Sequence, residues 1–300
     1  MPRLLLLLLA LLPTAVQAAR WSEPEMVGVL AERAISEVSG LTASRRHPGV
    51  YWAHNDSGHP AELHAIDAEG KRLATLRIPV KAIDWEDIAS FEWQGRPYLL
   101  LADVGDNGGI RAELQLIAIA EPEQLVDGME LQPAWIQRFR WPDGPRDCEA
   151  VAVDSRRGEV LLISKKRVPP ELFRLPLGPT DEPQAAELLG NLLGIDQPSD
   201  TDLEKNPVYG RYRSQITAAD LSPNGRVLAV LNYSGLQFYV RPAGADWRDL
   251  LPTLEPSRIA LPWLPQAEAL AFEADSSGLL VASEQTPSPI LRYRVLRDPP

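Results

Sequence analysis

Short β-rich apolar segments alternate with turn-forming clusters along most of the chain, and the alternation repeats. Each unit begins with a Glu or Thr followed by small and apolar residues, and a turn rich in Gly, Pro, Asn or Asp comes next. A period of roughly 50 residues is typical of repeat architectures. The five unit starts lie at residues 37–41, 86–89, 149–153, 217–221 and 268–272.

Each unit then continues with further predicted strands. A second strand follows the turn at 50–54, 98–103, 160–164, 227–232 and 279–283. A third lies at 62–66, 113–119, 171–175, 236–240 and 290–295, and a fourth at 73–78, 134–140, 185–192 and 257–261. Four strands per repeat is the composition of one propeller blade. The pattern therefore predicts an all-β fold, a β-propeller with five four-stranded blades.

The two ends of the predicted propeller complete each other. The last unit reaches Arg297 without a fourth strand, and residues 26–32 form an unassigned strand before the first unit. Pairing the two closes the ring and removes exposed strand edges. A sixth blade could be formed by residues 194–214, but their polar sequence favours a loop. Helical turns are expected at 121–128 and at 246–253.

The first residues predict export. Arg3 precedes an apolar run at 4–12, and Val16 and Ala18 are small residues at the positions that signal peptidases read. The run is shorter than the roughly 20 apolar residues of a membrane-spanning helix. We therefore expect a signal peptide at 1–18 and a single propeller domain at 19–300, periplasmic or secreted, monomeric and without a membrane span.

The net charge of the chain limits the kinds of partner that it can bind. With 41 acidic and 30 basic residues, the formal net charge is −11. This charge disfavours nucleic acid and anionic membrane surfaces, whose binding depends on Lys and Arg. A small molecule or an envelope ligand fits better. The single cysteine, Cys148, excludes an internal disulfide and is expected in the core.

Propeller geometry brings two polar sets to one mouth of the channel, because the innermost strand of a blade begins where the second strand ends. The first set starts the units and comprises Glu37, Glu86, Glu149, Thr217 and Glu268. The second set ends the second strands, at 54–58, 103–107, 164–166, 232–233 and 283–284. Its candidate ligand-binding and catalytic residues are His54, Asn55, Asp56, Asp103, Asp106, Asn107, Lys165, Asn232 and Glu284, and it also contains Tyr233. The sequence therefore predicts a largely acidic mouth.

Crowded carboxylates need compensation, because like charges raise one another's pKa and buried unpaired charges are costly. Ca²⁺ prefers oxygen ligands in flexible geometry, so Glu37, Glu86, Glu149 and Glu268 are candidate calcium ligands. No His/Cys cluster has zinc spacing. Alternatively, Lys165 and Lys166 could neutralise two of the glutamates without metal, or the mouth could be a solvated face.

Two residues are candidates for a general base at this mouth. The first is His54, whose ordinary pKa lies near 6.5, and the second is Asp103. His54 could instead be hydrogen-bonded at the start of its loop. Trp52 and Trp85 could form substrate platforms, but tryptophans packed between blades are the more common case.

Segments 35–41, 52–58, 84–89, 103–107 and 266–270 resemble exported bacterial propellers, similar to the SdiA-regulated propeller family and the esterase-like phytase domains. More distantly, they resemble calcium-dependent lactonase and phosphotriesterase propellers. The resemblance implies calcium-dependent hydrolysis, with Glu37 at the position of the first-blade glutamate of the lactonases. It departs at Glu86, Glu149 and Glu268, where those enzymes have Asn or Asp. The cluster of Lys165, Lys166 and Arg167 corresponds loosely to the phosphate-binding residues of phytases.

Two functions are compatible with these observations. The first is a metal-dependent hydrolase of esters, lactones or phosphate esters, in which the cation acts as a Lewis acid. The second is a non-catalytic propeller that binds a ligand or an envelope protein at the same mouth. No Gly-x-Ser-x-Gly motif occurs, which disfavours serine catalysis. A hydrolase should leave one coordination position of the metal open beside a base. A purely structural network should instead pair every glutamate with a Lys, an Arg or a backbone N–H.

Overall fold

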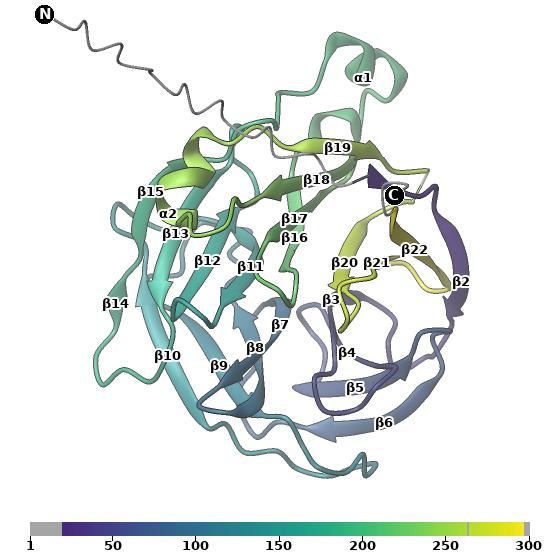
Figure 1. Ribbon diagram of the computed structural model, residues 1–300, viewed down its shortest axis with the longest axis vertical. Helices are drawn as coiled ribbons and strands as arrows, with labels where there is room; N and C mark the ends of the chain where they lie inside the picture. The colour runs from purple at the N-terminus through teal and green to yellow at the C-terminus, as the bar shows by residue number, and fades with distance from the viewer. Residues whose placement is uncertain (1–19, 263, 297–300) are drawn as a thin grey trace, which may run out of the picture.

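The computed structural model describes residues 20–262 and 264–296, so the predicted signal peptide lies outside the described residues. Five sheets, antiparallel except for one short parallel pair in the second, surround a central axis, and strands β3, β7, β11, β16 and β20 lie nearest to it (Figure 1). The fold is an all-β propeller with five blades, as the repeats predicted.

Each blade follows the chain from the centre outward. Blade 1 contains β3 (Val38–Ala43), β4 (Val50–Asn55), β5 (Glu62–Asp67) and β6 (Arg72–Arg77). Blade 2 contains β7 (Trp85–Trp93), β8 (Arg96–Asp103), β9 (Leu114–Ala120) and β10 (Trp135–Arg140), with the short β14 (Gln184–Ala185) alongside β10. Blade 3 contains β11 (Cys148–Asp154), β12 (Glu159–Ser164), β13 (Glu171–Pro176) and β15 (Glu187–Asn191). Blade 4 contains β16 (Ile216–Leu221), β17 (Val227–Asn232), β18 (Gly235–Val240) and β19 (Ser257–Ala260).

Blade 5 takes its outer strand from the other end of the chain. It contains β20 (Ala267–Phe272), β21 (Gly278–Ser283) and β22 (Ser288–Leu296), and β2 (Glu25–Leu30) pairs antiparallel with β22. The two-residue β1 (Arg20–Trp21) pairs with the end of β22. The predicted closure by an N-terminal strand is therefore confirmed.

The helical segments are short. Residues 194–214 hold α1 (Asp200–Lys205) and the 3₁₀ turn η1 (Gly210–Tyr212) rather than a sixth blade. The expected helical turn near 246–253 is α2 (Trp247–Leu250), continued by η2 (Leu251–Thr253). No helix in the described ranges is long and apolar enough to cross a membrane.

The helical turn predicted at 121–128 is wrong, because this segment is held to blade 1. The Glu121 carboxylate accepts the indole N–H of Trp52 at 2.7 Å, and the Gly128 N–H donates to the Thr75 carbonyl at 2.7 Å. These contacts keep residues 121–128 as a series of bends and turns along blade 1.

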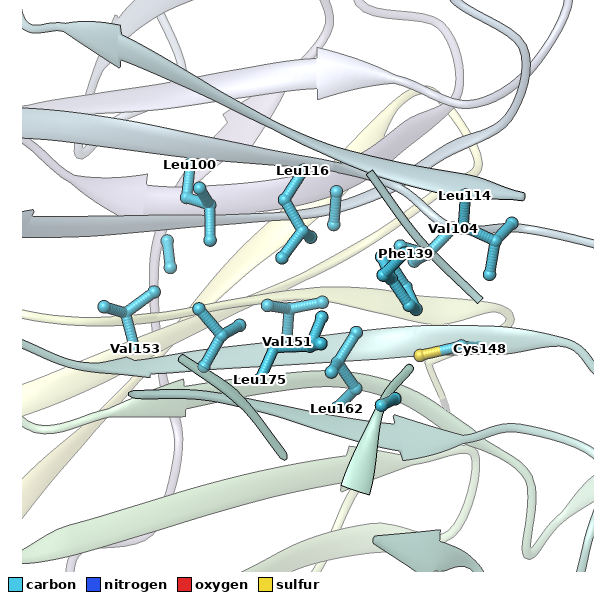
Figure 2. Close-up of a cluster of buried hydrophobic side chains, with 14 of the residues drawn as sticks. Leu100, Val104, Leu114, Leu116, Phe139, Cys148, Val151, Val153, Leu162 and Leu175 are labelled. Carbon is cyan, nitrogen blue, oxygen red and sulfur yellow. The ribbon is translucent and has the colours of Figure 1, made fainter. Parts of the chain in front are cut away.

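Apolar side chains fill the spaces between adjacent blades, one hydrophobic cluster at each interface. Between blades 2 and 3, Leu100 and Leu116 face Val151 and Leu162, with Cys148 buried beside them (Figure 2). Trp52 and Trp85 are buried between blades 1 and 2. These packed interfaces hold the inner strands at fixed positions around the channel.

Buried polar side chains bind the inner strands to one another across the channel. The Asp87 carboxylate on β7 accepts backbone N–H groups of Val151 at 2.8 Å and Ala219 at 3.2 Å, which belong to blades 3 and 4. Asp220 on β16 accepts the N–H of Phe272 in blade 5 at 2.8 Å. Inner strands have one unpaired edge, and these carboxylates satisfy donors that the sheets leave free.

Candidate functional site

Every inner strand has a β-bulge at its second residue. The register of pairing with the second strand skips one residue in each blade, always one position after the strand begins. A bulge bends the strand and redirects a side chain, and such bulges occur often beside functional sites. We call the five bulge residues the inner ring: Ser39, Glu86, Glu149, Thr217 and Glu268.

The structure corrects the position of Glu37. Ser39 occupies the inner-ring position in blade 1, and its hydroxyl donates to the Glu86 carbonyl at 2.8 Å. Glu37 lies two residues earlier, with a side chain 51% exposed and 3.5 Å from the His59 imidazole. The equivalent position two residues before the bulge holds Asp84 in blade 2 and Asp147 in blade 3.

The three inner-ring glutamates are buried but differ in their partners. Lys165 forms an ion pair with Glu149, and the Tyr233 hydroxyl donates to Glu268. The Glu86 carboxylate has no hydrogen bond or ion pair within the described residues, although Glu86 is only 3% exposed. Burial raises the pKa of Glu86 well above its ordinary value, and the nearby Glu149 and Asp56 carboxylates add to the increase.

Carboxylate oxygens gather in two overlapping triads around Glu86. One triad is Asp56, Asp84 and Glu86, and the other is Glu86, Asp147 and Glu149; within each, the oxygens lie within 4.8 Å of one another. Asp147 is 2.9 Å from the Lys166 ammonium, so the second triad contains two neutralised carboxylates. No Lys or Arg in the described part of the chain forms an ion pair with the first triad.

Gly105 lets these carboxylates reach their positions. A Cβ atom added at residue 105 would lie 2.0 Å from Glu86 Oε1 and 2.5 Å from Asp84 Oδ2. Both distances are far below a possible contact, so any other residue would displace the two side chains. The loop after β8 is therefore shaped around the first triad.

Burial also raises the pKa of three further carboxylates at this mouth, those of Asp56, Asp84 and Glu284. Burial is the chief cause for Asp56 and Asp84, and the negative charges of other carboxylates at the mouth raise the pKa of each further. Burial and the charges of Glu268, Asp56 and Glu37 raise the pKa of Glu284 to about 7. Their charges therefore act on one another as a single cluster. We call this cluster the acidic mouth: Glu37, Asp56, Asp84, Glu86, Asp147, Glu149, Glu268 and Glu284.

Several predicted site residues already form hydrogen bonds with groups in the surrounding loops. Asp103 is fully buried and accepts from the Asp84 N–H at 3.1 Å and from Arg111 at 2.7 Å. Asn55 accepts the Glu37 N–H at 3.1 Å, and Asn232 accepts two N–H groups of its own turn. Because these polar atoms already have partners, their arrangement suits loop structure better than ligand contact.

Asp106 and Asn107 link the loop after β8 to blade 3. The Asp106 carboxylate accepts the N–H groups of Ile110 and Arg111, each at 2.9 Å, and its own N–H donates to Asp147 at 2.8 Å. Lys166 donates to the Asn107 side chain at 2.8 Å. Together these contacts fix Asp147 within the second triad and Lys166 beside it.

His54 lies inside the fold rather than at the mouth. It is fully buried, its Nδ1 is 2.9 Å from the Asn55 carbonyl, and its ring meets that of Trp85 edge to face at 5.7 Å. Burial lowers the pKa of His54 to about 4. A neutral, enclosed imidazole is poorly placed to receive a proton from a reacting group at the mouth.

The sequence analysis did not single out Asp84 or Asp147 as site residues, whereas it placed Tyr233 at the mouth. Alternate residues of an extended strand face the same side, so the spacing of Asp84 with Glu86 and of Asp147 with Glu149 is a usable signal. The corresponding residues in blades 4 and 5 are Gln215 and Gln266, also polar. Tyr233 follows Asn232 directly, at the position that Lys165 occupies in blade 3.

Comparisons with known proteins do not assign the chain to a family. No family model matches the chain, and no curated protein matches it. Among solved structures, a luciferin-regenerating enzyme is similar, with a TM-score of 0.44 and 11% sequence identity. The match covers 91% of this chain and 96% of that one.

Proposed function

We propose that the acidic mouth binds a divalent cation, with Ca²⁺ the best fit, through Asp56, Asp84 and Glu86. The observation that carries this proposal is the buried Glu86 carboxylate, which forms no hydrogen bond or ion pair within the described residues and lies beside Asp56 and Asp84, which form no ion pair there either. The charges of Lys165 and Arg111 act on this triad only from beyond ion-pair distance. Leaving a buried carboxylate ionised without a partner costs several kcal/mol. Oxygen ligands of this kind are those that Ca²⁺ takes in proteins.

Ion pairs and a hydrogen bond already satisfy the other buried carboxylates near Glu86, so a cation is needed only on the side of Asp56 and Asp84. Lys165 and Lys166 already neutralise Glu149 and Asp147, and Tyr233 donates to Glu268. Gly105 also favours a cation site there, because the absence of a side chain leaves room for the Asp84 and Glu86 carboxylates to converge. Export, if residues 1–18 direct it, would suit the weak affinities of extracellular calcium modules, roughly 10⁻⁴–10⁻³ M.

We further propose that the chain is a cation-dependent hydrolase of an ester, lactone or phosphate ester. The bound cation would polarise the carbonyl or phosphoryl oxygen of the substrate. Glu284 is the candidate general base, because it belongs to the acidic mouth, interacts with the charge of Asp56 and has a pKa of about 7, which suits proton transfer near neutrality. It would take a proton from water as the water oxygen bonds to carbon or phosphorus and the leaving oxygen departs. The resemblance to esterase-like phytase and SdiA-regulated propellers is consistent with this class of reaction.

Thermal unfolding with added Ca²⁺ and with chelator tests the cation site. Saturating Ca²⁺ at 100 times its dissociation constant should stabilise the protein by about 2.7 kcal/mol. Glu86→Gln should lose this response and be at least as stable as wild type in chelator, because it removes an unpaired buried charge. Glu123→Gln, on an exposed side chain, is the matched control. An unchanged calcium response in Glu86→Gln would contradict the proposed ligands.

Hydrolysis is tested separately with aryl esters, lactones and phosphate monoesters. Activity should require the cation, disappear in Glu86→Gln and fall in Glu284→Gln with a changed pH profile. Calcium binding without turnover of any of these substrates would instead favour the non-catalytic binding propeller.

A further inference from the structure

A polar cavity lies at the mouth of the channel opposite the acidic mouth. It has a volume of about 320 Å³ and is formed by the turns that join the first and second strands of blades 1 to 4. Arg45 comes from blade 1, Glu92 from blade 2, Arg156 from blade 3 and Ser222 from blade 4. A smaller cavity of about 20 Å³ continues from Arg45 towards Asp220 and blade 5. All five blades therefore contribute to this end of the channel.

Arg45 brings an unused set of donors to the cavity. Its backbone N–H donates to Glu121 at 3.2 Å, but its guanidinium has no hydrogen bond or ion pair to the described residues. A guanidinium offers five N–H donors in a planar fork that matches carboxylate and phosphate oxygens. Arg156 uses one of its nitrogens on the Asn224 carbonyl at 2.8 Å and lines the same cavity.

The neighbouring carboxylates are mostly occupied. Asp154 pairs with Arg241 at 2.8 Å, and Glu121 accepts from Trp52. Burial raises the pKa of Asp220 to about 7, so this carboxyl is partly protonated near neutrality. Of the two described carboxylates that line the cavity, Glu92 forms no hydrogen bond or ion pair, although its charge acts on Arg45.

The two arginines also act on each other. Arg45 is exposed, yet desolvation among the turns lowers its pKa. The charges of Asp220, Glu92 and Glu121 oppose this decrease, and the charge of Arg156 adds to it. Like charges converging on one cavity repel, and an anion between them would relieve the repulsion.

We propose that this cavity is a binding site for a small oxyanion, a carboxylate or phosphate group, held by Arg45 and Arg156. The site is separate from the acidic mouth and does not depend on the function proposed there. The volume suits a small metabolite that carries such a group, and the fork of Arg45 would bind two of its oxygens.

Calorimetric titration of the mature protein with inorganic phosphate and with succinate tests the site. We expect saturable binding of at least one probe, and the comparison of the two distinguishes phosphate from carboxylate recognition. Arg45→Gln and Arg156→Gln should each weaken binding by about tenfold or more, as expected for loss of a charged hydrogen-bonding group. Arg45→Lys should retain part of the affinity, because it keeps the charge without the fork.

Two further variants distinguish binding at this cavity from a non-specific effect of the protein's charge. Glu92→Gln should tighten binding by removing a negative charge from the cavity wall. Arg96→Gln, on an exposed arginine at the start of β8 that does not itself line the cavity, should leave affinity unchanged. No saturable binding of either probe, or equal losses in Arg96→Gln and Arg45→Gln, would overturn the proposal.

Discussion

Asp87 offers a direct test of how the five blades are held together. Its carboxylate accepts three backbone N–H groups: that of Ile88 at 2.8 Å on one oxygen, and those of Val151 and Ala219 on the other. In Asp87→Asn, one of the two oxygens becomes an NH₂ group, which cannot accept. Either orientation of the amide therefore leaves one or two buried N–H donors unpaired.

Each unpaired buried donor costs about 1–3 kcal/mol, so Asp87→Asn should lower the free energy of unfolding by about 2–4 kcal/mol. Equilibrium unfolding in urea at constant pH measures this loss. Asp181→Asn removes the same charge from an exposed position and should change stability by less than about 0.5 kcal/mol. If Asp87→Asn were as stable as this control, the cross-channel hydrogen bonds would contribute nothing, and the reasoning would be refuted.

Three further predictions follow from the same structure. The pKa of Asp220 is raised from 3.8 to about 7 in the fold, so its stabilising contribution is full below pH ~4 and is lost as pH rises to about 7; Asp220→Asn should flatten this part of the stability–pH curve measured by urea unfolding. Gly105→Ala should abolish the calcium-dependent thermal shift while the protein remains folded by circular dichroism, because the new Cβ displaces Asp84 and Glu86; a wild-type calcium response would count against the first triad. Leu30→Ala, which truncates a side chain 1% exposed on the closing strand β2, should cost about 2–5 kcal/mol in denaturant unfolding, whereas Val29→Ala, 45% exposed, should cost far less.

The sequence predicted the propeller because each strand is bounded by turn residues and the repeats share one layout. The second strand of blade 4, for example, was expected at 227–232 and spans Val227–Asn232. Pairing of the first and last strands followed from the missing fourth strand of blade 5. Both features depend on local patterns that a single sequence displays.

The site was only partly predictable, because a β-bulge changes register without changing composition. Glu37 and Glu86 resemble each other in sequence, yet Ser39 and not Glu37 is the bulge residue of blade 1. A shift of two residues keeps the side chain on the same face, so the alternation of polar and apolar residues could not reveal it. The cross-channel role of Asp87 was equally hidden, since its partners lie 64 and 132 residues away in the chain.

Competition between protons and Ca²⁺ distinguishes the two ways in which the acidic mouth can relieve its charge. Burial and mutual repulsion raise the pKa of Glu86, Asp84 and Asp56, so proton uptake neutralises the first triad at low pH. Since metal binding requires deprotonated ligands, protons and the cation exclude each other. The calcium-induced thermal shift should therefore be small near pH 4.5 and increase towards pH 8. A shift that is independent of pH, or larger in acid, would mean that the cation binds away from these buried carboxylates.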